Sequence, residues 1–352
     1  MNAAWGSPYS GQTAHIGKAA SPSSALPNVH IRRYEDLVVD TATAHRSERT
    51  SLTVSGPLIP LALSPLMREN THMTTTPSDV IRYLLPFVAT AGSYSSYIQG
   101  RVGKHAAKDG ATAFHQALSD ADLTIQSYLE VVLLAKFPEL SFFSEEQDQS
   151  LNAKYFAPDG NLEVLLDPID GTRSYIDNRP HYQIIVAIHD RSELVGALAY
   201  MPRQGVCYIA TKGEGAYVLT HEEARTGHRG TRLRLTQKEG PILVFNKPDL
   251  CAKLAPYFEI RDVVVEYDAQ PGRYNFTNIF DGSTLANVSQ PCQGIDGGAL
   301  SFIAQEAGAL ATDFSGNPMG NFRLSPKRIV PETLVTANPE AHEKILKVLQ
   351  AK

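Results

Sequence analysis

Apolar residues at helical spacing predict that the globular part of the chain opens with two helices. Ser78 can cap the first helix, DVIRYLLPFVATAG (79–92), in which Pro86 should introduce a kink. The second helix lies in LSDADLTIQSYLEVVLLAKFP, where Pro138 ends the periodic pattern. Its apolar face is formed by Ile125, Leu129, Val132 and Leu133.

Short apolar runs follow these helices and predict strands. LEVLLD (162–167) is mostly apolar without strict alternation, as is typical of a strand buried on both faces. Polar or glycine-containing turns divide the next runs, which favours an antiparallel meander. These runs are YQIIVAIHD, LVGALAYMP, GVCYIAT and GAYVL.

The second half of the chain mixes helices with strands. ILVFN and VVVEYDA are predicted as strands, and GIDGGALSFIAQEAGAL as a helix with Gly308 just past its end. Asn338 and Pro339 are typical of the N-cap and first position of a last helix. We therefore expect two sequential layered subdomains of α+β and α/β type, residues 78–240 with the candidate site and residues 241–352.

Residues 1–77 are expected to be a disordered extension. GSPYSGQTAHIGKAASPSSALP is rich in Ser, Ala, Gly and Pro, and such a segment buries little apolar surface. An inert tail, with the native start at Met73, is one interpretation. Targeting to an organelle by residues 1–72 is the alternative, because no acidic residue precedes Glu35 and leader peptides share this bias.

The bulk composition excludes several classes of protein. The 352 residues carry a formal net charge of −5, which argues against a surface for a nucleic-acid polymer. Three widely spaced cysteines predict neither a disulfide framework nor a zinc site. No run of about 18 apolar residues occurs, so a membrane span is not expected. A cytoplasmic protein is the expectation.

Carboxylates gather at the predicted ends of strands and helices. They are Glu145 and Glu146 in SFFSEEQ, Asp167 and Asp170 in DPIDGT, and Asp296 in GIDGGA. Carboxylates clustered in such places repel one another and lose hydration, so a cation is expected to neutralise them. Mg²⁺ prefers a few carboxylates together with water and phosphate oxygens.

DPIDGT itself suggests how such a site is built. We expect Asp167 to end the strand, Pro168 to fix a turn and Asp170 to return to the same pocket. Gly171 permits a close backbone approach, and the amides of Gly171 and Thr172 can receive a phosphate group. Carboxylates that bind metal beside an anion cradle indicate phosphate chemistry.

Three separated signatures, SEEQ, LLDPIDGTRSYI and GIDGGALSFIAQEAGAL, resemble the inositol monophosphatase family of Mg²⁺-dependent, lithium-sensitive phosphatases. The resemblance runs from about residue 78 to the C-terminus. It implies a layered αβαβα sandwich, a homodimer, and hydrolysis of a small phosphorylated substrate by water that two or three Mg²⁺ ions activate.

The resemblance also implies roles for single residues. The metal ligands would be Glu145, Asp167, the Ile169 carbonyl, Asp170 and Asp296.

Thr172, paired with Asp122, would polarise the attacking water, so that these two and Glu145 would be catalytic. Gly171 and Thr172 would hold the phosphate, and Glu146 would support a third ion. An aspartate such as Asp122 in the first turn of a helix also fits a purely structural role.

Departures from the family pattern concern the substrate. Ser289 stands where inositol-type members carry a glutamate that grips sugar hydroxyls, and DGTRSYI resembles bisphosphate nucleotidases and histidinol-phosphate phosphatases. Inositol monophosphate is the first substrate expected, with 3′-phosphoadenosine 5′-phosphate and histidinol phosphate as alternatives. A non-catalytic relative that binds metal or phosphate is the alternative from another class.

Overall fold

The computed structural model describes residues 74–101, 120–245, 247–269, 275–319 and 328–351. All of them belong to one compact unit, Asn70–Lys352. The interpretations of residues 1–72 therefore lie outside the described residues. The division at residue 240 coincides with the gap between two sheets, and as a domain boundary it stays a prediction.

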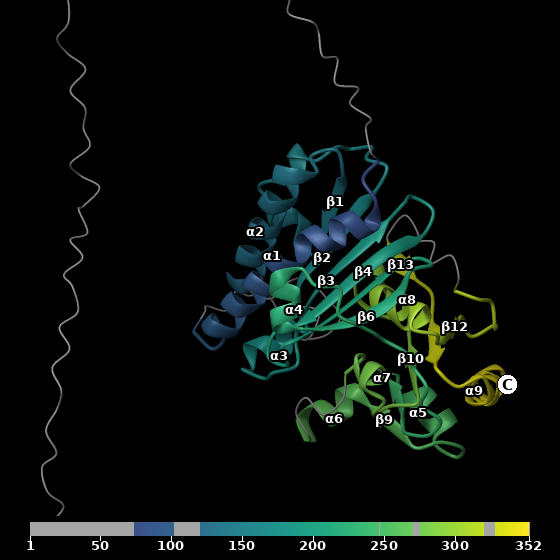
Figure 1. Cartoon of the computed structure of the whole chain (residues 1–352). Helices are drawn as coiled ribbons and strands as arrows, with labels where there is room; N and C mark the ends of the chain where they lie inside the picture. The colour runs from purple at the N-terminus through teal and green to yellow at the C-terminus, as the bar shows by residue number, and fades with distance from the viewer. Residues whose placement is uncertain (1–73, 102–119, 246, 270–274, 320–327, 352) are drawn as a thin grey trace, which may run out of the picture. The chain divides into compact units, whose positions relative to one another are not determined.

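Within the described residues, seven strands form the first sheet in the order β1 to β7 (Figure 1). β1 and β2 are parallel, and each later neighbour is antiparallel, which confirms the predicted meander. The strands are β1 (Ser141–Ser144), β2 (Glu163–Asp170), β3 (Gln183–His189), β4 (Leu194–Met201), β5 (Val206–Thr211), β6 (Gly215–Thr220) and β7 (Thr231–Arg232).

The second sheet is mixed and has the order β12-β14-β10-β8-β9. β8 is parallel to β9 and β10, whereas β14 is antiparallel to β10 and β12. Its strands are β8 (Ile242–Val244), β9 (Ile260–Asp262), β10 (Ala286–Ser289), β12 (Leu310–Thr312) and β14 (Thr333–Thr336). A separate short pair joins β11 (Cys292–Gln293) to β13 (Ile329–Val330).

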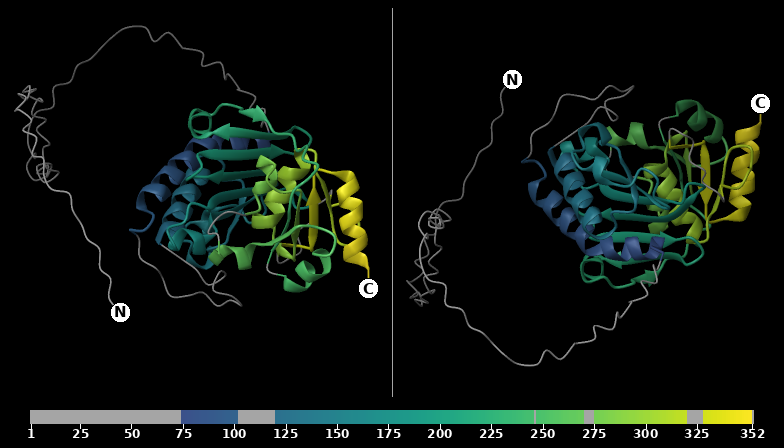
Figure 2. Two further views of the ribbon diagram at one scale, coloured as in Figure 1. Left: turned by 90° about the horizontal axis from the view of Figure 1, so that it is seen from below. Right: turned by 90° about the horizontal axis from the view of Figure 1, so that it is seen from above.

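Helices enclose and separate the two sheets (Figure 2). α1 (Pro77–Ile98) and α2 (Asp120–Lys136) cover the outer face of the first sheet, and α8 (Ala299–Glu306) covers its inner face. α5 (Pro248–Leu254) and α9 (Pro339–Gln350) cover the far face of the second sheet. The order of layers is thus helix, sheet, helix, sheet, helix, as the αβαβα expectation requires.

Shorter helices complete the described chain. They are α3 (Thr172–Ile176), α4 (His221–Thr226), α6 (Val263–Ala269), α7 (Asn278–Asp281), the 3₁₀ turns Gln147–Gln149 and Ala153–Tyr155, and the π-helical turn η4 (Gly294–Gly298). No helix in the described part of the chain combines the length and the apolar character that a membrane crossing requires.

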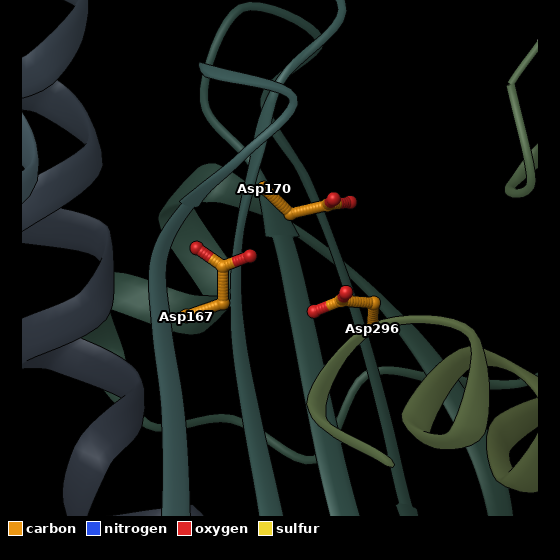
Figure 3. A group of neighbouring side chains, drawn as sticks. All are labelled: Asp167, Asp170 and Asp296. Atoms are coloured by element: carbon orange, nitrogen blue, oxygen red, sulfur yellow. The ribbon is translucent and has the colours of Figure 1, made fainter. Parts of the chain in front are cut away.

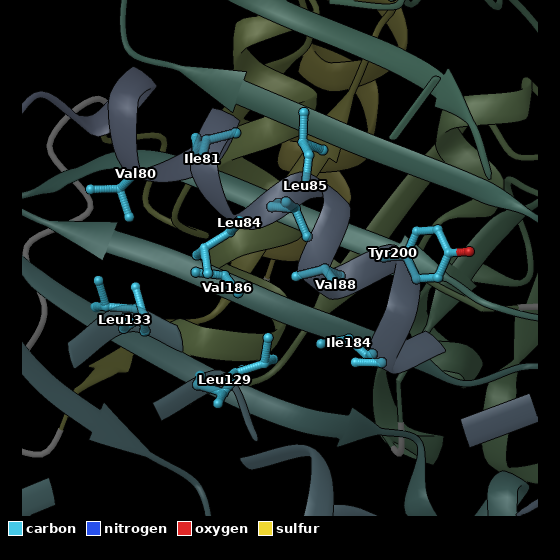
Figure 4. Packing of buried hydrophobic residues seen from close by; sticks show 14 of the residues in the cluster. Val80, Ile81, Leu84, Leu85, Val88, Leu129, Leu133, Ile184, Val186 and Tyr200 are labelled. Carbon is cyan, nitrogen blue, oxygen red and sulfur yellow. The ribbon is translucent and has the colours of Figure 1, made fainter. Parts of the chain in front are cut away.

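β3 shows why the strands of the first sheet are almost continuously apolar. Ile184 and Val186 (Figure 4), together with Ile188, belong to the core under α1 and α2. Ile185 and Ala187 belong to the core that includes α8. Successive side chains of a strand point to opposite faces, and here both faces are covered. The apolar run therefore reflects the central position of this sheet.

The first helix starts earlier than the sequence predicts. Thr76, and not Ser78, is the N-cap, and its side chain and that of Asp79 form a reciprocal capping box. Pro77 occupies the first turn, where its missing N–H is harmless, and the helix continues through Pro86 to Ile98. Ser78 is instead buried, and its hydroxyl donates to Glu214 (2.9 Å).

VVVEYDA was wrongly predicted as a strand, because it forms the helix α6. The carboxylate of Asp262 accepts hydrogen bonds from the N–H groups of Val264 (2.9 Å) and Val265 (3.4 Å), which satisfies donors of the first helical turn. Val265 is 68% exposed, so its apolar side chain does not indicate a buried strand. Local capping prevails over β-propensity here.

The last two helix predictions are confirmed. Gly308, with φ of +100°, follows the end of α8 in the backbone region that favours glycine. Asn338 caps α9 by accepting from the N–H of Ala341 (3.0 Å), with Pro339 at the first position.

Leu84 should be a critical contact between α1 and the first sheet, because only 1% of its side-chain surface is exposed (Figure 4). We expect Leu84→Ala to lower the free energy of unfolding by ~2–5 kcal/mol through loss of burial and a residual cavity. Leu151→Ala, at a position 74% exposed, is the matched control and should change it by less than about 0.5 kcal/mol in urea denaturation. Equal effects of the two variants would contradict this packing.

Candidate metal centre

Three aspartates from two distant parts of the chain meet at one edge of the first sheet. Asp167 and Asp170 come from the end of β2, and Asp296 comes from η4 before α8. One carboxylate oxygen of each lies within 4.8 Å of the others, and the three side chains converge in Figure 3. Asp167 is buried and the other two are half-buried.

A β-bulge places Asp167 and Asp170 beside the same point. Residues three apart in a regular strand point to opposite faces. Asp167 pairs with Ile185 and Asp170 with Gln183, so β2 has one residue more than β3 between these pairs. The expected turn at Pro168 is therefore wrong: the strand does not end at Asp167 but continues through a bulge, where a proline is tolerated.

Close backbone packing holds Asp296 in position. Ile295 is almost fully buried, and a Cβ at Gly297 would lie 2.6 Å from the sulfur of Cys292. A side chain at Gly297 would therefore have to displace the Cys292 thiol, beside the turn that carries Asp296. Burial raises the pKa of the Cys292 thiol to about 12, so the structure offers no reactive thiolate beside the aspartates.

Thr172 and Asp122 lie in contact beside this cluster. The hydroxyl of Thr172, at the start of α3, lies 3.3 Å from Oδ1 of Asp122 and 2.9 Å from the carbonyl oxygen of Ile169. Asp122 is fully buried in the first turn of α2. The hydroxyl has one hydrogen, which it donates to one acceptor at a time. By rotating, the Thr172 hydroxyl can donate either to Asp122 or to the Ile169 carbonyl.

The two glutamates after β1 take different positions. Glu145 is exposed and lies outside the group of three, although its N–H donates to the Leu166 carbonyl (3.0 Å), next to Asp167. Glu146 is buried, and its carbonyl accepts from the side-chain amide of Gln126 (3.1 Å). The structure thus gathers three of the four predicted carboxylate ligands, and Ile169 lies between two of them in the sequence.

Burial and mutual repulsion destabilise the ionised aspartates. Burial, followed by the charges of Glu145, Asp296, Asp170 and Asp122, raises the pKa of Asp167 well above its usual range.

The pKa of Asp170 is raised to about 6, mainly by burial and also by Glu145. Hydrogen bonds from Gln183 and from the N–H of Gly171 counteract this rise. A hard divalent cation would relieve the repulsion and accept these oxygen donors, so the residues fit Mg²⁺.

Gln183 is a site residue that the sequence analysis missed. Its amide nitrogen donates to Oδ2 of Asp170 (2.6 Å), and the side chain is buried at the start of β3. A glutamine just before the apolar residues IIVAI is only a weak signal in the sequence that this side chain belongs to a site. Its importance depends on the pairing of β3 with the bulge, which cannot be seen in the sequence.

A family model described as "Inositol monophosphatase family" matches residues 86–352. Among curated proteins, the Nus factor SuhB of Haemophilus influenzae is 25% identical over 236 residues, covering 63% of this chain and 82% of that protein. An inositol-1-monophosphatase of Rhizobium meliloti is 30% identical over 112 residues, covering 32% of this chain and 40% of that protein.

Solved structures share the fold. One described as an IMPase/NADP phosphatase complexed with Mg²⁺ and phosphate has a TM-score of 0.59 and 19% sequence identity. The match covers 79% of this chain and 97% of that chain. It supports the layered architecture described above.

Asp170→Asn should stabilise the metal-free protein. Because the folded state raises the pKa of Asp170 to about 6, it binds more protons than the unfolded chain between about pH 4 and 6, so stability falls as pH rises through that window. At pH 8 with EDTA, we expect the free energy of unfolding of the variant to exceed that of the parent by ~2 kcal/mol. The variant should also lose most of the stabilisation that Mg²⁺ gives the parent protein.

Asp313→Asn is the matched control, because hydrogen bonds in its turn lower the pKa of Asp313. This control should not gain stability in EDTA and should keep the full response to Mg²⁺. An Asp170→Asn protein that is less stable than its parent in EDTA would contradict the repulsion described here.

Gln183→Leu should weaken Mg²⁺ binding, because the amide both orients the Asp170 carboxylate and favours its ionised form. A loss of about ten-fold in Mg²⁺ affinity is expected, as for residues that support metal ligands. Isothermal titration with Mg²⁺ measures this. Gln350→Leu removes a comparable hydrogen bond, to Phe314 (3.1 Å), and should leave the affinity unchanged.

Proposed function

The chain belongs to the inositol monophosphatase family, and on this premise we propose that it is a Mg²⁺-dependent phosphomonoesterase acting on a small phosphorylated metabolite. The convergence of Asp167, Asp170 and Asp296 from two distant segments is the observation that carries the proposal. A purely structural role would not favour three repelling carboxylates at one point.

Asp167, Asp170 and Asp296 would hold Mg²⁺, with the Glu145 carboxylate and the Ile169 carbonyl completing the set. Bound there, Mg²⁺ would lower the pKa of water and neutralise charge on the phosphate. The number of ions, two or three, and the support of a third by Glu146 belong to the same proposal.

Thr172 and Asp122 would act on the attacking water. When the Thr172 hydroxyl donates to Asp122, the lone pairs of its oxygen are available to accept a hydrogen bond from water. Asp122 would thereby orient the threonine and draw proton density away from the nucleophile, as a general base does. In the other rotamer of the hydroxyl, the same hydrogen is donated to the Ile169 carbonyl (2.9 Å).

The backbone after the bulge would receive the phosphate. Gly171 has φ of +83°, and a Cβ there would meet the carbonyl oxygen of His181 at 3.1 Å, so the position favours glycine. The amide of Thr172 lies at the start of α3, next to Asp170, and the N–H of Gly171, which donates to the Asp170 carboxylate here, would turn to the phosphate when Mg²⁺ holds that carboxylate. This arrangement supports an anion cradle adjoining the metal ligands.

The departures from the family pattern concern the part of the site that would recognise the substrate. Ser289 is buried and lies 2.6 Å from the hydroxyl of Thr333, so it does not replace the sugar-gripping glutamate of inositol-type members. Inositol monophosphate remains the first candidate, followed by 3′-phosphoadenosine 5′-phosphate and histidinol phosphate. Lithium sensitivity, a homodimer and a cytoplasmic location remain predictions.

A second candidate function is a non-catalytic role in binding a partner. It is favoured by one observation, that relatives 25–28% identical to this chain are named Nus factors or putative Nus factors. Under this alternative the carboxylates would bind metal without turnover. Activity measurements separate the two functions.

We expect the purified protein with Mg²⁺ to release phosphate from at least one of the three substrates, and EDTA to abolish the release. Asp167→Asn should lower kcat by at least ~10²-fold, because it removes a buried ligand from the centre of the cluster. Asp281→Asn, in α7, should retain the parental rate. Failure of all three substrates with the folded, Mg²⁺-loaded protein would favour the partner-binding role.

A further inference from the structure

A pocket of about 260 Å³ lies on the outer side of the first sheet, between the start of α1 and the β5–β6 hairpin. The segment after α4 closes its third side. The lining residues that matter here are Ile81, Arg82, Ile209, Tyr217, His228 and Arg229.

The pocket is separate from the candidate metal centre. Thr211, at the end of β5, is level across the paired strands with Gly196, Ile188 and Val164. Val164 precedes Asp170 by six residues on β2, which corresponds to about 20 Å along the strand. A molecule in this pocket therefore does not contact the aspartates.

Two guanidinium groups line the pocket without a salt bridge. Within the described residues, neither Arg82 nor Arg229 lies within 4.0 Å of a carboxylate. The one lining carboxylate, Glu214, already accepts a hydrogen bond from the Ser78 hydroxyl (2.9 Å). Asp79 and Glu214 offset part of the positive charge, and the two guanidinium groups provide the donors that suit an anionic group.

Tyr217 holds Arg229 in place. The guanidinium of Arg229 donates to the Tyr217 hydroxyl (2.7 Å) and lies 4.7 Å from the ring centroid. Arg232 lies over the same ring at 5.8 Å and adds positive charge. Most donors of Arg229 remain available to a bound molecule.

The segment that carries Arg229 lies between two glycines with positive φ. Gly227 ends α4 with φ of +71°, and Gly230 has φ of +74°. A Cβ at Gly230 would lie 2.5 Å from the carbonyl oxygen of Val218, so the backbone packs directly on β6. The Thr226 hydroxyl lies 2.7 Å from Nδ1 of His228. The segment thus packs against β6 at Gly230, while residues 226–229 are exposed.

Apolar side chains form the floor. Ile81 and Leu85 of α1 meet Ile209 of β5 beneath the charged rim. We infer that this pocket binds a small molecule that carries a carboxylate or a phosphate-like group on a compact apolar body. The anion would contact Arg82 and Arg229, and the apolar body would lie on the floor.

Benzoate, phenylphosphonate and neutral benzamide test this inference on the full chain in the presence of Mg²⁺. Phenylphosphonate has no ester bond to hydrolyse, so turnover does not interfere. By NMR titration, we expect at least one anion to bind with Kd below about 10 mM and at least about five-fold more tightly than benzamide. Comparing benzoate with phenylphosphonate shows which anionic group the pocket prefers.

Variants locate the binding. Arg82→Gln and Arg229→Gln should each weaken it at least about five-fold. Arg225→Gln is the matched control, because Arg225 lies on α4, is exposed and pairs with Glu222. This variant should not weaken the binding. Asp170→Asn should also leave it intact, even if it abolishes turnover. Absence of binding by both anions, or binding that neither pocket variant weakens, would overturn the inference.

Discussion

Repulsion between buried carboxylates is the constraint on which the functional part of this molecule depends. Asp167 and Asp170 are placed where their ionised forms are unfavourable, and the charges of Glu145 and Asp296 add to that cost. The surrounding layers must therefore hold the aspartates together against their own electrostatics. They do so with covered sheet faces, a bulge and a tightly packed turn at Gly297. A protein arranged in this way gains stability when a divalent cation binds.

Much of the fold could be predicted from the sequence because local rules and burial agree over most of it. The meander was predicted from apolar runs separated by turns, and α9 from Asn338 and Pro339. The prediction of a strand at VVVEYDA was wrong because the Asp262 side chain caps a helix there. Apolar composition does not reveal such a hydrogen bond. The order of strands in the second sheet depends on long-range pairing, which no local pattern determines.

The candidate site was predictable in its residues but not in its geometry. DPIDGT indicated a carboxylate pair, and the position of Asp296 at a helix start suggested a common cation site, but the distance between them was not predictable from the sequence. Physical reasoning on the sequence supplied a turn at Pro168 where the structure has a bulge. Gln183 was missed for the same reason, since its contact with Asp170 exists only in the paired register of β2 and β3. Sequence identifies the chemical groups, and strand pairing decides which of them meet.

The extra residue in β2 lengthens the strand between two aspartates without sending them to opposite faces. Removing one residue between Asp167 and Asp170 would leave the two aspartates two positions apart, so regular pairing with β3 would still keep both carboxylates on one face. The strand would become more regular, and what it would lose is one backbone unit between the two carboxylates. The bulge therefore adds backbone, and not a change of face, to this end of the strand.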